Sequence, residues 1–303
     1  MKYAILFNPS SGTALSSGLK SGHLHELFAA SGIDATVDGS DDPLETKVAN
    51  AVASDADVIV SAGGDGTATA VAHGIAGSGK ILAILPLGTA NMLARDLGIP
   101  IALEKAVAAL ADTDTIEIDA GEVNGRLFLH NVVVGTIPAI AAARERVRGQ
   151  NIVALLGFFR YLIRRLRNAR RTAVSITSRD TDDRIERIHA IAVANNSYDQ
   201  GWGKLFSRSC LDAGSLTLYI LHRLSFADAV RLWLEMAMGR WQEDEALVIE
   251  SVRSVTLGAK RQAISAMIDG EVATLQTPLN FRIRERAVRV LVPKVRAKAA
   301  EPA

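Results

Sequence analysis

Three short polar segments, each directly after an apolar run, carry residue types that bind phosphate groups. They read Asn-Pro-Ser-Ser-Gly at 8–12, Gly-Gly-Asp-Gly-Thr at 63–67 and Pro-Leu-Gly-Thr-Ala-Asn at 86–91. Glycine lets the backbone approach a ligand closely, and hydroxyl and amide side chains bond to phosphate or base. Two of the segments open helical patterns, whose free N–H groups and dipole attract anions. Together they predict a site for a phosphorylated ligand.

One such segment alone has a simpler interpretation. Residues 63–66 could form a tight strand–helix turn with Asp65 as the helix cap, because short polar residues favour cap positions. That interpretation does not account for the other two segments. A further stretch, 74–80, matches the G-x-x-x-x-G-K spacing of a phosphate-binding loop. It follows a helix and enters a strand, which is the reverse of the required order, so we interpret Lys80 as a turn residue.

The elements that position these segments alternate along the first 115 residues. We predict strands at 2–8, 34–37, 58–61 and 81–85, and helices at 19–30, 43–53, 67–75, 92–97 and 103–111. Such alternation indicates a parallel sheet with helices on both faces. In these sheets ligands bind at the carboxyl ends of the strands, where the three polar segments lie.

From about residue 116 the pattern becomes β-rich. Asn124-Gly125 is a strong hairpin turn because both residues tolerate the positive φ angles it needs. We predict strands at 173–177, 189–194, 216–221, 247–257, 263–268, 280–283 and 288–292, and helices at 152–168 and 226–238. The chain is therefore predicted to hold an α/β domain over 1–115 and a β-rich domain with added helices over 116–303.

Composition excludes several classes of protein. The formal net charge of the 303 residues is only +1, which indicates no partner by charge alone. A single cysteine, Cys210, excludes an internal disulfide framework and fits a reducing cytoplasm. We recognise neither a signal peptide nor an apolar run of membrane-spanning length. We expect a cytoplasmic protein.

Charge is unevenly distributed, with nine arginines and one acid between residues 144 and 171. Apolar residues recur there at helical spacing. One interpretation is a helix lying on an anionic membrane surface. The other is a helix packed on the second domain with solvated arginines, and both stay open. We expect no nucleic-acid partner, because no recognised binding motif is present.

Residues 58–67, Val-Ile-Val-Ser-Ala-Gly-Gly-Asp-Gly-Thr, and 85–100, Leu-Pro-Leu-Gly-Thr-Ala-Asn-Met-Leu-Ala-Arg-Asp-Leu-Gly-Ile-Pro, resemble the diacylglycerol kinase catalytic-domain family, in particular its bacterial lipid kinases. The segments at 8–9, 212–216 and 268–271 fall in the expected order. The resemblance covers essentially the whole chain. It implies a Rossmann-like nucleotide domain followed by a sandwich-like, lipid-binding domain. NAD kinases share the Gly-Gly-Asp-Gly loop, but the 85–100 segment is typical of the lipid branch.

The resemblance also implies roles for individual residues. Glu271 matches the general base that takes the proton from a lipid hydroxyl. Asp65 would orient phosphates or Mg²⁺. From Asp-Gly-Glu alone, a solvated glutamate in a hairpin turn is the simpler interpretation of Glu271. The residues that would bind ATP are Asn8, Gly63, Gly64, Asp65, Gly66, Thr67, Ala68, Thr69, Gly88, Thr89 and Asn91.

Three positions depart from the family pattern: Ala70 replaces a glutamate, Met92 replaces the aspartate of an Asn-Asp pair, and Ala213 replaces another aspartate. Ala213 replaces the expected aspartate of a structural Mg²⁺ site, so that site stays unassigned.

The resemblance implies a cytoplasmic, membrane-peripheral kinase that uses ATP and Mg²⁺ to phosphorylate the hydroxyl of a membrane lipid such as diacylglycerol. A binding protein without catalysis and a kinase for a soluble substrate are the alternatives, and a homodimer is left open.

Overall fold

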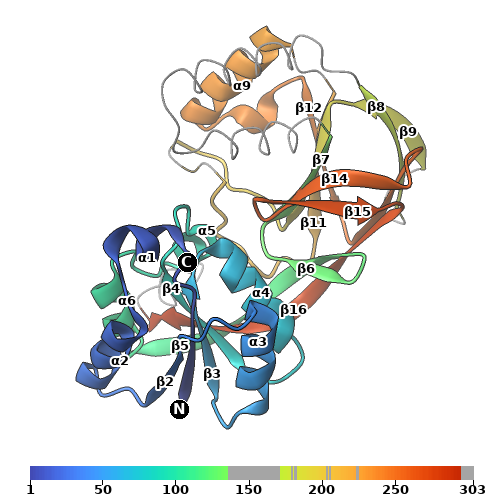
Figure 1. Cartoon of the computed structure of the whole chain (residues 1–303). Helices are drawn as coiled ribbons and strands as arrows, with labels where there is room; N and C mark the ends of the chain where they lie inside the picture. The colour runs from blue at the N-terminus through green and yellow to red at the C-terminus, as the bar shows by residue number, and fades with distance from the viewer. Residues whose placement is uncertain are drawn as a thin grey trace, which may run out of the picture. The chain divides into compact units, whose positions relative to one another are not determined.

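The computed structural model describes residues 1–135, 171–178, 180, 183–202, 204, 206–222 and 225–294. They form two units (Figure 1). The first unit comprises Met1–Ala120 and the chain from Glu285 onward, and the second comprises Gly121–Arg284. The helix predicted at 152–168 lies outside the described residues.

The first unit is built on a parallel sheet with the order β2, β1, β3, β4. These strands are β2 (Ala35–Asp38), β1 (Tyr3–Phe7), β3 (Val58–Gly63) and β4 (Ile81–Pro86). Every residue of β1, β3 and β4 is buried. Near-continuous apolar strands of this kind are typical of a sheet covered on both faces, so the predicted α/β architecture is confirmed.

The helices of the first unit cover the sheet in two groups. Helices α3 (Leu44–Ala53) and α4 (Asp65–Ile75) pack against each other, and so do α2 (Ser21–Ala30) and α6 (Leu103–Ala109). Figure 1 shows the two pairs on opposite sides of the strands. The shorter helices α1 (Gly12–Ser17) and α5 (Met92–Asp96) follow the loops after β1 and β4. Each strand therefore ends in a loop that leads to a helix.

The second unit is antiparallel throughout its described strands. One sheet has the order β12, β11, β10, β7, β14, β15. In the other, the start of β16 (Leu279–Pro293) is followed by β13, β8 and β9. Their bounds are β6 (Arg126–Phe128), β7 (Asn131–Gly135), β8 (Thr172–Thr177), β9 (Arg184–Ile188), β10 (Ala190–Asn195), β11 (Leu216–Leu221), β12 (Leu247–Val252), β13 (Ser254–Ala259), β14 (Ala263–Ile268) and β15 (Glu271–Gln276).

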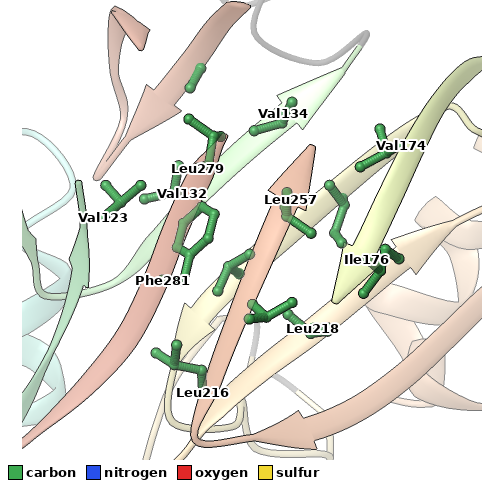
Figure 2. Close-up of a cluster of buried hydrophobic side chains, with 14 of the residues drawn as sticks. Val123, Val132, Val134, Val174, Ile176, Leu216, Leu218, Leu257, Leu279 and Phe281 are labelled. Carbon is green, nitrogen blue, oxygen red and sulfur yellow. The ribbon is translucent and has the colours of Figure 1, made fainter. Parts of the chain in front are cut away.

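An apolar core lies between the two sheets of the second unit (Figure 2). Val132 and Leu218 contribute from the six-stranded sheet, and Ile176, Leu257 and Phe281 contribute from the other. Alternate residues of each strand point inward, as in a β-sandwich. The prediction of a β-rich, sandwich-like domain is therefore confirmed.

The structure corrects two predicted strands. The run 247–257 is not one strand but two, β12 and β13, which belong to different sheets and are separated at Arg253, whose N–H donates to Asp180 Oδ2 at 2.7 Å. The separate strands predicted at 280–283 and 288–292 are one strand, β16 (Leu279–Pro293), with Arg286 at φ 49°.

Strand β16 also changes the division of the chain. Its first residues pair with β13 in the second unit, while Arg289 and Val290 pair in parallel with β4 in the first. Strand β5 (Thr113–Val123) likewise runs across the division at Ala120. The chain therefore crosses between the units twice, whereas the prediction had a single boundary after residue 115. Within the described residues, no helix combines the length and apolar composition needed to cross a bilayer.

Candidate functional site

The carboxyl ends of β1, β3 and β4 carry the three predicted loops, and backbone hydrogen bonds join them. Asn8 N–H donates to Ala62 O at 3.0 Å, and Leu87 N–H donates to Gly63 O at 2.9 Å. Thr13 N–H, from the first turn of α1, donates to Leu87 O at 2.8 Å. The three segments that the sequence singled out are thus held together as one surface.

Gly64 and Gly88 bring two of these loops into backbone contact. A Cβ on Gly88 would lie 2.5 Å from Gly64 Cα, and a Cβ on Gly64 would lie 3.2 Å from Gly88 Cα. A Cβ on Gly63 would meet the Cβ of Thr67 at 2.6 Å. The sequence analysis attributed these glycines to close approach of a ligand. The structure shows that they are also needed for the loops to pack on each other.

Asn91 shapes the third loop. It has a left-handed backbone, with φ 48° and ψ 47°, and is 4% exposed. Its Oδ1 accepts the N–H of Gly88 at 2.8 Å, and its Nδ2 donates to Gly88 O at 2.9 Å. Both polar atoms of the amide group therefore form hydrogen bonds that close the loop. Thr89, between these two residues, is exposed.

Asn8 braces the first loop against the second. Its Nδ2 donates to Thr67 Oγ1 at 3.0 Å, and its Oδ1 accepts the N–H of Ser10 at 3.0 Å. Thr13, which the sequence analysis did not select, adds a hydrogen bond from its Oγ1 to Gly88 O at 3.1 Å. Its signal was a hydroxyl residue directly after the glycine of the first loop.

Asp65 begins helix α4, where a carboxylate interacts favourably with the helix dipole. It is half-buried, and its Oδ1 accepts the N–H of Leu93 at 3.3 Å, which links α4 to α5. Gly66 beside it is also half-buried, whereas Ala68 and Thr69 are buried. We interpret these last two as packing residues of the helix. Asp65 thus supplies the one carboxylate among the predicted nucleotide-binding residues.

Glu271 lies in the second unit, as the first residue of β15. It pairs with Ile268 across a two-residue turn formed by Asp269 and Gly270, whose φ angles are 46° and 92°. Both angles are positive, as a type I′ hairpin turn requires. The Glu271 side chain is 65% exposed, with its Oε2 4.0 Å from an Arg126 nitrogen. Its assignment as a general base stays a prediction.

Asp269 fixes this turn to the neighbouring strand. Its carboxylate accepts the N–H groups of Leu129, His130 and Asn131 at 2.8, 2.8 and 3.0 Å. The sequence analysis treated the Asp-Gly-Glu segment only as a motif and missed this role. Asp269 therefore fixes the position of the turn from which Glu271 starts β15.

A buried arginine also binds the segment that leads into β7. Arg208 is 2% exposed and donates to Leu129 O at 2.6 Å and to Asn195 O at 3.0 Å. Its second terminal nitrogen lies 3.0 Å from His130 Nδ1. Since a guanidinium only donates, Nδ1 accepts and the imidazole is neutral. Burial, and then the Arg208 charge, hold the pKa of His130 well below its ordinary value.

The described part of the chain adds no cluster of metal-ligating side chains. Among the residues that the structure describes, no three His, Cys, Asp or Glu side chains form a group that could hold a metal ion by themselves. Ala213 is exposed beside Asp212, whose Oδ1 accepts from Cys210 Sγ at 3.4 Å. Lys80 lies in the connection between α4 and β4, in the helix-to-strand order that the sequence analysis predicted, and it donates to Ser54 O at 2.8 Å. The structural Mg²⁺ site stays unassigned.

Two sequence-family models match the chain. Residues 2–123 match the diacylglycerol kinase catalytic domain, and residues 134–292 match the YegS C-terminal NAD kinase beta sandwich-like domain. A diacylglycerol kinase from Staphylococcus haemolyticus is 26% identical over 298 residues, which cover 96% of this chain and 88% of the relative. The similarity therefore extends over both units.

Solved structures share the fold over the same length. A diacylglycerol kinase from Bacillus anthracis superposes with a TM-score of 0.72 at 20% identity, covering 97% of this chain and 98% of the other. An NAD kinase from Archaeoglobus fulgidus, in complex with ATP, gives a TM-score of 0.51 at 13% identity, covering 99% and 97%. The arrangement of strands described above is thus a recurring one.

Proposed function

Because the chain belongs to the bacterial diacylglycerol kinase-like family, we propose that it is an ATP-dependent lipid kinase acting on the hydroxyl of a membrane lipid such as diacylglycerol. The observation that carries this proposal is the joining of three polar loops at the strand ends. A surface of glycine backbone beside the first turn of a helix suits phosphate groups. The acceptor follows from the names of the relatives.

In this proposal the phosphates of ATP lie against residues 63–67 and 88–89. Asn8, Thr67 and Asn91 keep the loops in place through the hydrogen bonds described above. Thr89 is exposed and offers its hydroxyl as a donor. Positioning of this kind is the main contribution a kinase makes, because phosphoryl transfer needs little covalent chemistry from the protein.

The donor set also fits Mg²⁺. In sites for phosphoryl transfer this ion is usually held by one or two carboxylates together with substrate phosphates and water. Asp65 supplies one half-buried carboxylate at the loops. Mg²⁺, when bound, neutralises charge on the transferred phosphoryl group. Asp65 therefore orients the phosphates, either directly or through the ion.

Glu271 is the proposed general base. Its carboxylate takes the proton of the lipid hydroxyl as the oxygen attacks phosphorus. The Asp269-Gly270 turn and the three N–H groups that bind Asp269 hold the backbone of Glu271 in a defined position. The exposed side chain leaves room for an acceptor to reach it.

Two other functions are distinguished from this one by a single assay. The protein is incubated with Mg²⁺, γ-labelled ATP and an extracted bacterial lipid mixture, and the products are separated by solvent extraction. Label in an organic-soluble phosphate ester supports the proposal. Label in a soluble nucleotide supports a kinase like the NAD kinases, whose fold is similar. ATP binding without transfer supports a protein that has lost catalysis, as Ala70, Met92 and Ala213 would suggest. The Asp65→Asn variant is the control for contaminating kinases.

A further inference from the structure

Helix α9 (Phe226–Met238) of the second unit has an exposed apolar stripe. Val230, Leu234 and Met238 are 43%, 48% and 54% exposed. They are spaced four residues apart and therefore lie on one face of the helix. Leu232 and Met236, by contrast, pack on the buried aromatic cluster that includes Tyr198, Tyr219 and Trp241. The helix thus holds apolar side chains both against the sheet and in solvent.

An exposed aromatic loop adjoins the end of this helix. Gly201 N–H donates to the carbonyl of Gly239, the residue that ends α9, at 3.1 Å. Trp202, next in the chain, is 85% exposed. Phe206 in the same loop is 38% exposed, and its ring packs on Tyr198 and Trp241, with ring centroids 5.4 and 6.3 Å apart, so it belongs to the buried aromatic cluster. We call Trp202, Val230, Leu234 and Met238 the α9 surface.

Helix α9 is capped at both ends and is bound to its own unit by an ion pair. Ser225 and Asp228 form a capping box at its start, and Gly239 ends it with φ 72°. Arg231 forms two hydrogen bonds with the Asp244 carboxylate, at 2.9 and 2.8 Å, which fix the helix to its own unit. The exposed stripe is therefore not required for folding.

The α9 surface groups exposed apolar side chains more closely than the rest of the described second unit does. Elsewhere in the described part of the second unit, large exposed apolar side chains occur singly, on three different strands: Ile185 on β9, Val248 on β12 and Val272 on β15. Single exposed apolar residues are ordinary, whereas a contiguous group indicates an interaction surface.

We propose that the α9 surface docks on a lipid bilayer, with its apolar side chains at the boundary between headgroups and acyl chains. This rests on the proposed function, since an enzyme whose acceptor is a membrane lipid must reach it at the bilayer. An amphipathic helix lying in the interface buries its apolar face about 5–10 Å deep. Tryptophan is enriched at this depth because its ring is apolar and its N–H is polar.

The charges around the α9 surface agree with a bilayer. Lys204 and Arg240, whose side chains are 55% and 70% exposed, lie beside the aromatic loop and the helix end, and suit lipid phosphates. Each already faces a carboxylate, Asp199 at 3.8 Å and Glu243 at 3.4 Å. The net attraction to anionic lipid is accordingly small. Arg231, next to Val230 on the helix, is 46% exposed and is likewise paired, with Asp228 and Asp244. Docking through this surface is therefore driven by apolar burial, with paired cations at its rim.

The test measures binding to vesicles of phosphatidylcholine and phosphatidylglycerol by co-sedimentation. The full-length double variant Leu234→Ser/Met238→Ser and the single variant Trp202→Ser should each bind at least about tenfold more weakly than the parent protein. The matched control is Ile185→Ser, which removes a 78% exposed apolar side chain from the same unit and should bind like the parent. Circular dichroism during thermal unfolding verifies that all variants are folded.

Three results would overturn the proposal. One is unchanged vesicle binding by both α9 variants, and another is an equal loss in Ile185→Ser. The third is a parent dimer, seen by sedimentation, that the double variant dissociates, since the occupant would then be a second copy of the chain.

Transfer assays separate this proposal from the proposed function. With a short-chain, water-dispersed diacylglycerol the double variant should retain parental activity, while with vesicles it should lose activity in proportion to binding. If the parent protein phosphorylates no lipid, the proposed function fails, and the contrast between the α9 variants and Ile185→Ser in vesicle binding still decides the α9 surface.

Discussion

Gly64 and Gly88, from the loops after β3 and β4, touch backbone to backbone, so that a Cβ on Gly88 would lie only 2.5 Å from Gly64 Cα. A carbon–carbon contact at van der Waals distance is about 3.5–4.0 Å. The two loops therefore approach as closely as two glycines allow. The nucleotide surface proposed above depends on this contact before any ligand is bound.

Gly88→Ala should therefore destabilise the protein by about 1–3 kcal/mol, because the added methyl group must push the loops apart. Urea denaturation measures the loss. The control is Gly22→Ala, a helical position where a Cβ has no neighbour within 4 Å, and where alanine should be neutral or slightly stabilising. ATP affinity should fall in Gly88→Ala alone. Equal stability of the two variants would show that the loops have room to adjust.

Asp65→Asn separates the charge of this residue from its structural contact. The amide oxygen can still accept the N–H of Leu93, so the fold and the link between α4 and α5 should persist. Removing the negative charge should abolish phosphoryl transfer, because Asp65 is the one carboxylate at the joined loops. Asp65→Ala should in addition lose about 1 kcal/mol of stability through the unmade hydrogen bond. Full activity in folded Asp65→Asn would remove this residue from the mechanism.

The sequence allowed these loops to be predicted because their chemistry is local. Glycines, an aspartate and hydroxyl residues stand next to one another in the chain, directly after apolar runs, and parallel strands bring their carboxyl ends to one edge. The orientation of Asn91 was not predictable in the same way. Its left-handed backbone and its two hydrogen bonds to Gly88 depend on the closed shape of the loop.

Non-local contacts account for most of what the sequence did not show. Asp269 accepts N–H groups from residues 129–131, about 140 positions earlier in the chain, and no local pattern announces that pairing. The crossing of β16 between units is likewise decided by its partners, β13 and β4. Helix α9 was predicted with correct bounds, but apolar residues on several of its faces left open which face is buried.

His130 should make stability depend on pH. The folded protein holds the pKa of His130 well below its ordinary value, through burial and then the charge of Arg208. Below the unfolded pKa of about 6.5, the unfolded chain binds a proton that the folded protein does not. The contribution of His130 to the free energy of unfolding is therefore fully present above that pH. Below it, the free energy of unfolding falls by up to about 1.4 kcal/mol per pH unit.

The variant His130→Asn isolates this contribution. The Asn Oδ1 occupies a position close to that of the imidazole Nδ1 and can accept from Arg208, but it does not titrate. Urea denaturation between pH 7.5 and 5.5 should show a smaller slope for His130→Asn than for the parent protein. The parent protein, measured in parallel, is the control. Identical slopes in the two proteins would contradict the assignment.

The arginine-rich segment predicts a second, electrostatic contribution to membrane binding, distinct from the apolar α9 surface. Replacing Arg164, Arg165 and Arg167 with glutamine should weaken binding to anionic vesicles. The difference from the parent protein should shrink as salt rises, because screening reduces the attraction between exposed charges. Co-sedimentation at low and high salt measures it. Unchanged binding at low salt would mean that these arginines are only solvated.

Glu271→Gln tests the proposed general base. The substitution keeps the size of the side chain and removes the proton acceptor, and the 65% exposed position should tolerate it without loss of stability. General-base catalysis typically contributes a factor of about 10²–10⁴, so kcat should fall by that order while ATP affinity is unchanged. Steady-state kinetics with a lipid acceptor and direct ATP titration measure the two quantities.

Asp269→Asn is the informative comparison, because it alters a structural residue of the same turn and leaves the proposed base in place. Its carboxylate accepts three backbone N–H groups, and a neutral amide binds them less strongly, so this variant should lose stability. If Glu271 is the base, Glu271→Gln should lower kcat without changing stability. Asp269→Asn should lower stability as well as kcat. If kcat of Glu271→Gln falls less than about threefold, below the range of general-base effects, the base lies elsewhere, with Asp65 the next candidate. If the parent protein transfers no phosphate to any lipid, Glu271 is a residue of the hairpin turn and no more.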